Sequence, residues 1–269
     1  MGRVMAVANQ KGGVGKTTTA VNLAAGLALQ GRRTLLVDID PQASASTGVG
    51  VRPSASERSI YDVLLGEIPG EEVVQKTIVD GLDVLPATRD LVGADVELVA
   101  LHDREQRLHG ALASLRGRYN FVLIDCPPSL SLLTINALRT ADGVLVPLQA
   151  EYYALEGLSA LLDTLRRVRE TLNPGLALDG LLLTMFDRRN TLARQVREEI
   201  QGHFGSQVLE TIIPRNVRLS ESPSHGLPVL LYDPASRGAA AYRRLAREVI
   251  DRTAARALQI GRQLVQHDS

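Results

Sequence analysis

The chain has 269 residues, and its 30 Lys and Arg are balanced by 30 Asp and Glu, so it lacks the strong positive charge of a protein that coats nucleic acid. Its one cysteine excludes an internal disulfide framework and a metal site built from several Cys ligands. No apolar run approaches the ~20 residues that span a bilayer. The N-terminus leads directly into a strand-like run without a signal peptide. We therefore expect a cytoplasmic protein.

Lysine is rare among the basic residues of the chain. The chain contains 27 Arg and three Lys, namely Lys11, Lys16 and Lys76. Two of the three lysines lie five residues apart in one glycine-rich stretch. A general preference for Arg explains the composition but not this placement, so the stretch requires a chemical explanation.

Short apolar runs alternate with stretches of helical spacing along most of the chain. The expected strands are 4–8, 34–37, 82–85, 121–124, 144–148 and 178–184. The expected helices are 17–30, 91–101, 104–115, 130–138, 155–172 and 192–204, with a C-terminal helix at about 237–265 that frays at its end. This alternation predicts an α/β fold, a mainly parallel twisted sheet with helices on both faces. No linker divides the sequence, so we expect one domain over residues 1–269.

Two local patterns lie between these elements. The segment 43–58 is rich in Ser, Gly and other small residues, and we expect a mobile loop there. Ser59 precedes an apolar run that ends at Gly66, which is the pattern of a short helix with a capping residue at each end.

A glycine-rich run joins the first strand to the first helix: Asn9-Gln10-Lys11-Gly12-Gly13-Val14-Gly15-Lys16-Thr17-Thr18. Glycines let several backbone N–H groups point inward, and a helix N-terminus adds partial positive charge. Lys16 can reach the β- and γ-phosphates of a nucleotide, and the Thr17 hydroxyl can bind Mg²⁺. Gln10 stands where the standard phosphate-binding loop has glycine, so this loop is a variant.

The run resembles the deviant Walker A motif of the ParA/MinD group of P-loop ATPases. The resemblance implies ATP and Mg²⁺ as cofactors and a dimer in which a second lysine, here Lys11, reaches the nucleotide of the partner subunit. Lys16 would then neutralise phosphate charge in its own subunit and Lys11 in the other. The implied nucleotide-binding residues of this loop are Lys11, Gly12, Gly13, Val14, Gly15, Lys16, Thr17 and Thr18.

Acidic residues follow two of the expected strands. Asp38 and Asp40 end the second strand, and in an open parallel sheet ligands lie at the carboxyl ends of strands. By resemblance Asp40 is the residue that activates water for attack on the γ-phosphate, while Asp38 is expected to interact with the loop or with metal-bound waters. The alternative is that one of the two carboxylates, Asp38 or Asp40, caps the turn before Pro41.

Asp125 follows the apolar run 121–124, which is the pattern of a Walker B strand, and it is expected to reach Mg²⁺ through water. Pro127 and Pro128 stiffen the exit of this strand, which suits a segment that senses the γ-phosphate. We expect Cys126 to pack in the core rather than to act as a nucleophile, since no His stands near it in sequence.

The second half of the chain resembles the chromosomal ParA/Soj branch, so the resemblance extends to about residue 250. It implies that Pro214 and Asn216 contact adenine and that Arg189 and Arg218 bind double-stranded DNA without sequence preference. Charge offers a separate argument, because residues 188–262 contain 13 Arg against seven Asp and Glu. Such binding would depend steeply on salt.

These features predict a chromosome- or plasmid-partitioning ATPase, cytoplasmic and associated with the nucleoid. By resemblance, an ATP-bound dimer binds DNA, and a ParB/Spo0J-type centromere-binding protein stimulates the hydrolysis that resets it. One alternative is a MinD-like ATPase that acts on a membrane surface, because the C-terminal helix is basic and amphipathic. It lacks Phe and Trp, however, and we expect it to pack on the sheet. Another alternative is a metabolic or electron-transfer enzyme of the same fold.

Overall fold

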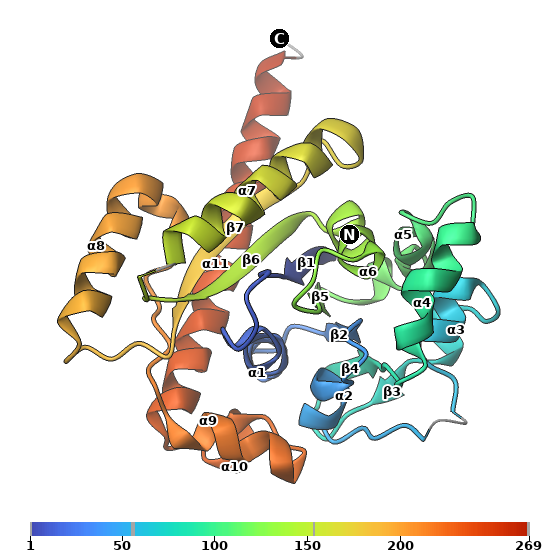
Figure 1. Cartoon of the computed structure of the whole chain (residues 1–269), viewed down its shortest axis with the longest axis horizontal. Helices are drawn as coiled ribbons and strands as arrows, with labels where there is room; N and C mark the ends of the chain where they lie inside the picture. Colours follow the sequence, from blue (N-terminus) through green and yellow to red (C-terminus); the bar gives the residue numbers. More distant parts are fainter. Residues whose placement is uncertain (1, 55–56, 153, 268–269) are drawn as a thin grey trace.

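The centre of the molecule is a seven-stranded sheet with strand order β3-β4-β2-β5-β1-β6-β7 (Figure 1). The computed structural model describes residues 2–54, 57–152 and 154–267, apart from the side chains of residues 156 and 260–267. Neighbouring strands are parallel except for the pair β3 and β4. The strands are β1 (Arg3–Val7), β2 (Thr34–Asp38), β3 (Gln75–Lys76), β4 (Leu82–Leu85), β5 (Phe121–Asp125), β6 (Gly143–Gln149) and β7 (Ala177–Thr184).

Helices cover both faces of this sheet, as the sequence predicts (Figure 1). They are α1 (Lys16–Ala28), α2 (Ser44–Gly48), α3 (Ile60–Leu65), α4 (Leu91–Glu97), α5 (Arg107–Leu112), α6 (Leu132–Thr140), α7 (Ala154–Thr171), α8 (Thr191–Phe204), α9 (Val217–Glu221), α10 (Val229–Tyr232) and α11 (Arg237–His267). Short 3₁₀ turns occupy Gly70–Glu72, Leu98–Ala100, Arg116–Arg118, Gly205–Gln207 and Ser222–His225. One apolar core lies between the sheet and α3 to α8, and the other lies between the sheet and α1, α2 and α9 to α11. Successive residues of β1 point alternately into these two cores.

The six predicted strands and the capped helix are confirmed. Ser59 and Asp62 form a reciprocal capping box at the start of α3, and Gly66 ends the helix in the left-handed conformation. The edge strand β3 was not predicted because it has only two residues and both are polar. Its Lys76 forms an exposed ion pair with Asp83 at 3.0 Å.

The expectation of a mobile loop at 43–58 is wrong for the first part of this segment. Residues Ser44–Gly48 form α2, and the side chains of Ala45 and Ser46 are fully buried. Ser46 is held from outside the segment, because its hydroxyl donates to Asp38 and accepts the backbone N–H of Ala87. Residues 55 and 56 of this segment lie outside the described residues.

The first half of α11 packs as expected. Tyr242 is buried with its hydroxyl 3.2 Å from that of Thr19 in α1. Gly26 allows α11 to approach α1, since a Cβ there would lie 3.0 Å from the Cβ of Ala246. The C-terminal end of the helix projects past the body of the molecule (Figure 1). No helix among the described residues is long and apolar enough to cross a bilayer.

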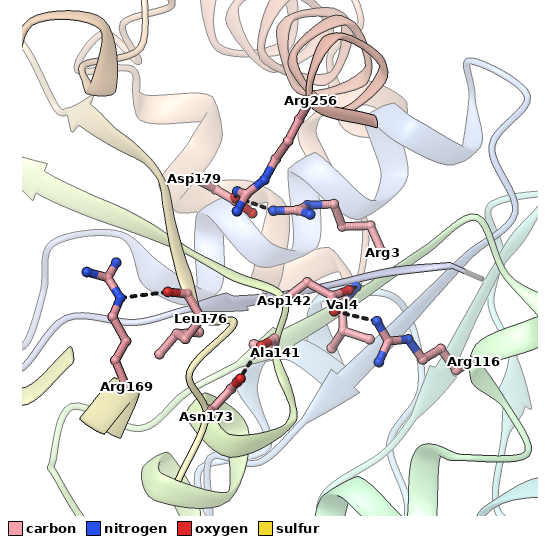
Figure 2. Close-up of polar contacts among 10 residues, drawn as sticks. All are labelled: Arg3, Val4, Arg116, Ala141, Asp142, Arg169, Asn173, Leu176, Asp179 and Arg256. Atoms are coloured by element: carbon pink, nitrogen blue, oxygen red, sulfur yellow. Dashed lines mark hydrogen bonds and ion pairs between the residues drawn. The ribbon is translucent and has the colours of Figure 1, made fainter. Parts of the chain in front are cut away.

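One ion pair attaches α11 to the amino-terminal edge of the sheet, where two further ion pairs lie. Figure 2 shows Arg256 and Arg3 converging on the buried carboxylate of Asp179 in β7. Close by, Arg116 pairs with Asp142, whose other oxygen accepts the backbone N–H of Val4 at 2.8 Å. These contacts join β1, β7 and α11 at the amino-terminal edge of the sheet.

Candidate nucleotide-binding site

The three acidic and glycine-rich motifs meet at the carboxyl edge of the sheet. Strand β1 lies between β5 and β6, and β2 lies on the other side of β5. The loop that follows β1 is therefore flanked by the carboxyl ends of β5 and β6. In the parallel register Asp125 stands opposite Val7 on one side and opposite Asp38 on the other. The sheet thus brings together residues that are more than 80 positions apart in sequence.

The loop between β1 and α1 has the backbone of an anion-binding site. Gly13 and Gly15 adopt φ angles of 74° and 86°, which favour glycine. No side chain caps the start of α1, and its first turn contains no acidic residue. Its free N–H groups and the helix dipole therefore remain available to phosphate oxygens.

Residues from the neighbouring strands hold the loop in place. The Thr184 hydroxyl donates to the carbonyl of Val14 at 2.7 Å, and the Gln149 amide donates to that of Gly13 at 3.1 Å. Asn9 donates to the carbonyl of Pro147 and accepts the backbone N–H of Lys11. The sequence did not identify these roles, because the contacts join segments that are far apart in the chain.

The two lysines of the loop have different surroundings. Lys16 is 6% exposed, and its Nζ donates to the carbonyl of Lys11 at 3.2 Å, which places its charge under the loop. Burial lowers the pKa of Lys16, while Asp125 and Asp40 act in the opposite direction. The Lys11 ammonium instead lies 2.7 Å from Glu151, and both side chains are about half exposed. The Lys11 charge is thus held at the surface by an ion pair.

Asp125 is a buried acidic residue that can accept a ligand. It is fully buried, and neither of its carboxylate oxygens has a hydrogen-bond partner among the described residues. Burial raises the pKa of Asp125 well above its usual value, and the carboxylate of Asp38 adds to this shift. The hydroxyl of Thr17 and the ammonium of Lys16 act in the opposite direction.

These residues fit Mg²⁺. A lone carboxylate next to a threonine hydroxyl suits an ion that takes most of its ligands from water and phosphate. The described residues contain no cluster of three or more His, Cys, Asp or Glu side chains that could hold a metal by themselves. Cys126 is buried, and burial raises the pKa of its thiol, so it is an inert core residue as expected.

Asp38 is held by hydrogen bonds from its own turn and from α2. Its carboxylate accepts the backbone N–H and the hydroxyl of Ser46 at 2.8 and 2.7 Å, and the backbone N–H of Asp40 at 3.2 Å. It therefore organises the turn into α2, which is the alternative that the sequence left open. Burial raises the pKa of Asp38 to about 6, although the bonds from Ser46 oppose this shift.

Asp40 lies in the same turn but differs in its surroundings. One of its oxygens accepts the backbone N–H of Gln42 at 2.9 Å, and the side chain is 8% exposed. It is an electrostatic neighbour of Lys16 and Asp125. A carboxylate at this position has capacity to accept a proton or hydrogen bond from water beside the phosphates.

The segment expected to contact adenine lies beside the phosphate loop. Phe186, which follows β7, forms a parallel bridge with Pro214. Met185 connects this bridge to the loop, because a Cβ on Gly15 would lie 3.7 Å from the Met185 side chain. Asn216 caps α9 by accepting the backbone N–H of Arg218 at 3.0 Å, which leaves its amide NH₂ free to donate.

The two arginines expected to bind DNA are unequal. The Arg189 side chain is exposed and has no ion-pair partner within the described part of the chain. Arg218 lies 2.8 Å from Glu221 and 3.2 Å from Asp233. A hollow of about 620 Å³ lies beside Arg189, and its other basic lining residues are Arg188, Arg215, Arg237 and Arg244.

Comparison with known proteins supports the sequence resemblance. A family model described as an AAA domain matches residues 2–178. The sporulation initiation inhibitor protein Soj of Bacillus subtilis is 54% identical over 249 residues, which cover 93% of this chain and 98% of that protein. The chromosome partitioning protein ParA of Caulobacter vibrioides is 54% identical over 252 residues, covering 93% and 94% of the two chains.

Solved structures of the same fold are less similar in sequence. A Mycobacterium smegmatis structure described as cobyrinic acid a,c-diamide synthase with bound ADP and magnesium is 41% identical, with a TM-score of 0.81 and coverage of 92% and 93%. The cell division ATPase MinD of Pyrococcus furiosus is 29% identical, with a TM-score of 0.78 and coverage of 93% and 99%. The Soj and ParA proteins therefore resemble this chain more closely than either of these structures does.

Proposed function

The chain belongs to the Soj/ParA family of P-loop ATPases, and we propose that it is a chromosome- or plasmid-partitioning ATPase whose nucleotide state controls its binding to DNA. The observation that supports this best is the group of buried Lys16, Asp125 and Asp40 beneath an uncapped helix N-terminus. These charges are arranged as a triphosphate with Mg²⁺ requires.

In the proposed reaction each residue of the site has a distinct role. The N–H groups at the start of α1 and the ammonium of Lys16 bind the phosphates. Thr17 and Asp125 would hold Mg²⁺, Asp125 through water, and the bound ion would supply positive charge beside the phosphates. Asp40 orients a water for attack on the γ-phosphate. Pro214 and Asn216 contact the adenine.

Lys11 connects the site to a second copy of the chain. Its pairing with Glu151 leaves it on the surface, beside the opening of the phosphate loop. We propose that in the ATP-bound homodimer Lys11 leaves Glu151 and contacts the phosphates of the other subunit, and that hydrolysis releases it. The exchange costs little, because an exposed ion pair contributes only about 0–1 kcal/mol.

The surface proposed for DNA is centred on the hollow beside Arg189. Its arginines at positions 188, 189, 215, 237 and 244 are exposed and form no ion pair within the described residues. Arg218 contributes less, since Glu221 and Asp233 offset its charge. A dimer doubles the number of phosphate contacts and so increases affinity steeply at low salt. This binding places the protein on the nucleoid, where a ParB/Spo0J-type partner stimulates hydrolysis.

The experiment that tests this proposal compares two partners under the same conditions. Binding to double-stranded DNA and to anionic liposomes is measured with ATP, with ADP and without nucleotide, each at two salt concentrations. We expect ATP-dependent DNA binding that weakens strongly at higher salt, and no ATP-dependent flotation with liposomes. ATP-dependent flotation that is abolished by deletion of residues 252–269 would instead support the MinD-like alternative.

A further inference from the structure

Helix α4 and the turn that follows it present an apolar face to solvent. Val92, Val96 and Val99 are 67%, 76% and 55% exposed, and their spacing of four and three residues places them on one side of the helix. Leu91, Ala94 and Leu98 fill the core on the other side. A helix that is apolar on both sides is normally buried on both sides.

The apolar face continues into a hollow. Val99 lines a space of about 470 Å³ together with Leu132 and Ile135 from α6 and Leu172 at the end of α7. The valines of α4 and this hollow form one surface, which we call the α4 face and define as Val92, Val96, Val99, Leu132, Ile135 and Leu172.

The surroundings of the α4 face are acidic. Residues 62–105 contain eleven Asp and Glu against three Lys and Arg. Asp90, Asp95, Glu97 and Asp103 form no ion pair with any Lys or Arg in the described part of the chain. The nearby Arg104 is paired with Glu105. An apolar strip flanked by unneutralised carboxylates complements a segment with apolar residues at helical spacing and Lys or Arg between them.

A second copy of the chain does not fit this face. A twofold dimer places the same surface on both subunits, and here it would bring the unneutralised carboxylates against one another. The occupant that the charge favours is therefore a basic segment of a different protein.

A hydrogen bond connects α4 to the helix that follows the Asp125 segment. Asp95 projects from α4 and accepts the backbone N–H of Leu133 at 3.3 Å. Leu133 lies in the first turn of α6, and residues 126–131 join that turn directly to Asp125. A ligand on α4 can therefore shift the segment that carries Asp125.

We propose that the α4 face docks a basic, apolar helical segment of a partner protein and that docking accelerates hydrolysis through Asp95 and Leu133. This inference rests on the proposed function, because it places the stimulating partner on a specific surface. Asp95 acts in it as a positioning residue.

The test uses the double variant Val92→Arg and Val96→Arg, which adds positive charge to the face without disturbing the core. The matched control is Leu258→Arg, which changes an equally exposed apolar side chain on α11. For each chain we measure the basal ATPase rate, DNA binding with ATP, and both the affinity for and the stimulation by the purified ParB-type protein of the same organism. We expect the double variant to lose affinity and stimulation at least tenfold while its basal rate and DNA binding stay within twofold of the parent.

Three results would separate the possible errors. If the double variant binds the partner and responds to it as the parent does, the docking surface is wrong. If it instead fails to dimerise with ATP, the face is an interface between copies of this chain and the inference is also wrong. If the parent itself neither binds nor responds to the partner while a basic amphipathic peptide of 18 residues binds α4, the proposed partner is wrong and the surface is right.

The positioning role of Asp95 has its own readout. Asp95→Ala should keep the partner affinity of the parent but lose most of the stimulated kcat, and Asp95→Asn should restore it, because the amide oxygen can still accept the Leu133 N–H. Equal stimulation in Asp95→Ala and the parent would contradict the proposed connection.

Discussion

The surfaces on either side of the nucleotide site carry opposite charge, although the chain as a whole carries none. On one side, around α8 and the first half of α11, exposed arginines line the hollow beside Arg189. On the other side, around α3 to α5, carboxylates surround the α4 face, and Figure 1 shows these two groups of helices on opposite sides of α1. The zero net charge of the chain is therefore the sum of a basic and an acidic surface, which suit different partners.

Ion pairs decide which of the charges on each side are available. Arg218 belongs to the basic side by position, yet Glu221 and Asp233 neutralise it. Arg104 lies on the acidic side, where Glu105 neutralises it in turn. A count of charges along the sequence therefore locates each surface, and the contacts in the structure identify the residues that can bind.

Both sides are connected to elements of the nucleotide site, one to the phosphate loop and the other to the segment after Asp125. From the basic side, Thr184 at the end of β7 holds the carbonyl of Val14. From the acidic side, Asp95 holds the start of α6, which follows the segment after Asp125. Changes at the nucleotide should therefore affect both surfaces.

The largest effect is expected from Lys16→Ala, which should remove nucleotide control from both surfaces at once. Loss of a buried cation beside the phosphates should weaken ATP binding on the order of 100-fold or more. A titration with fluorescent ATP and a DNA-binding assay with and without ATP measure the two consequences. Lys76→Ala is the matched control, since Lys76 has an exposed side chain on β3, outside the nucleotide site. ATP-dependent DNA binding by the Lys16 variant would contradict the role assigned to this lysine.

Asp40→Ala should separate the binding of ATP from its hydrolysis. Loss of the residue that orients water should lower the hydrolysis rate about 10²- to 10⁴-fold while ATP still binds, so the basic surface should stay on DNA. Single-turnover hydrolysis and the lifetime of the DNA complex are the measurements. Asp38→Asn serves as the control, because an Asn there can still accept from Ser46. Hydrolysis at the parental rate in the Asp40 variant would show that the assignment is wrong.

Much of this arrangement could be predicted from the sequence because its signals are local. The apolar runs of the parallel strands and the Gly-Lys-Thr-Thr run indicate buried strands and a phosphate loop at fixed positions, and the structure has them there. Asp125 is likewise marked by the apolar strand before it. The roles of individual loop residues remain predictions.

What the sequence did not indicate depends on contacts between distant segments. Whether Asp38 faces the metal or a turn is decided by Ser46, which itself is held by Ala87. The support of the phosphate loop by Thr184 and Gln149 can be predicted only when the order of the strands is known. The α4 face was missed for a related reason, because apolar residues at helical spacing look the same whether or not another element covers them.

Charge reversal on the basic side tests whether ion pairs decide which arginines contribute to DNA binding. Arg189→Glu should lower DNA affinity more than Arg218→Glu, because Arg218 is already paired with Glu221. Removing one Arg–phosphate interaction from each subunit of the dimer should also reduce the slope of log affinity against log salt by about 1.8. DNA binding over a range of salt concentrations measures both quantities. Arg104→Glu on the acidic side is the control and should change neither. Equal effects of the Arg189 and Arg218 variants would show that the ion pairs do not limit Arg218.

The smallest effect is expected from Asp125→Asn in the absence of nucleotide. The raised pKa of Asp125 means that the folded chain holds this proton at pH values where the unfolded chain has released it, so stability should fall as the pH rises above about 4. Asp38, with a pKa raised to about 6, acts in the same direction. The variant should therefore unfold about 2–6 °C above the parent at pH 8, and this difference should disappear near pH 4. With Mg²⁺ and ATP the order should reverse, because only the parent gains the metal contact. Thermal unfolding at both pH values, with and without Mg²⁺ and ATP, measures this. If the nucleotide-free variant is less stable than the parent at pH 8, the Asp125 carboxylate is stabilised in the free protein. Asp125 would then not be an unpaired carboxylate that gains its partner only when the metal binds.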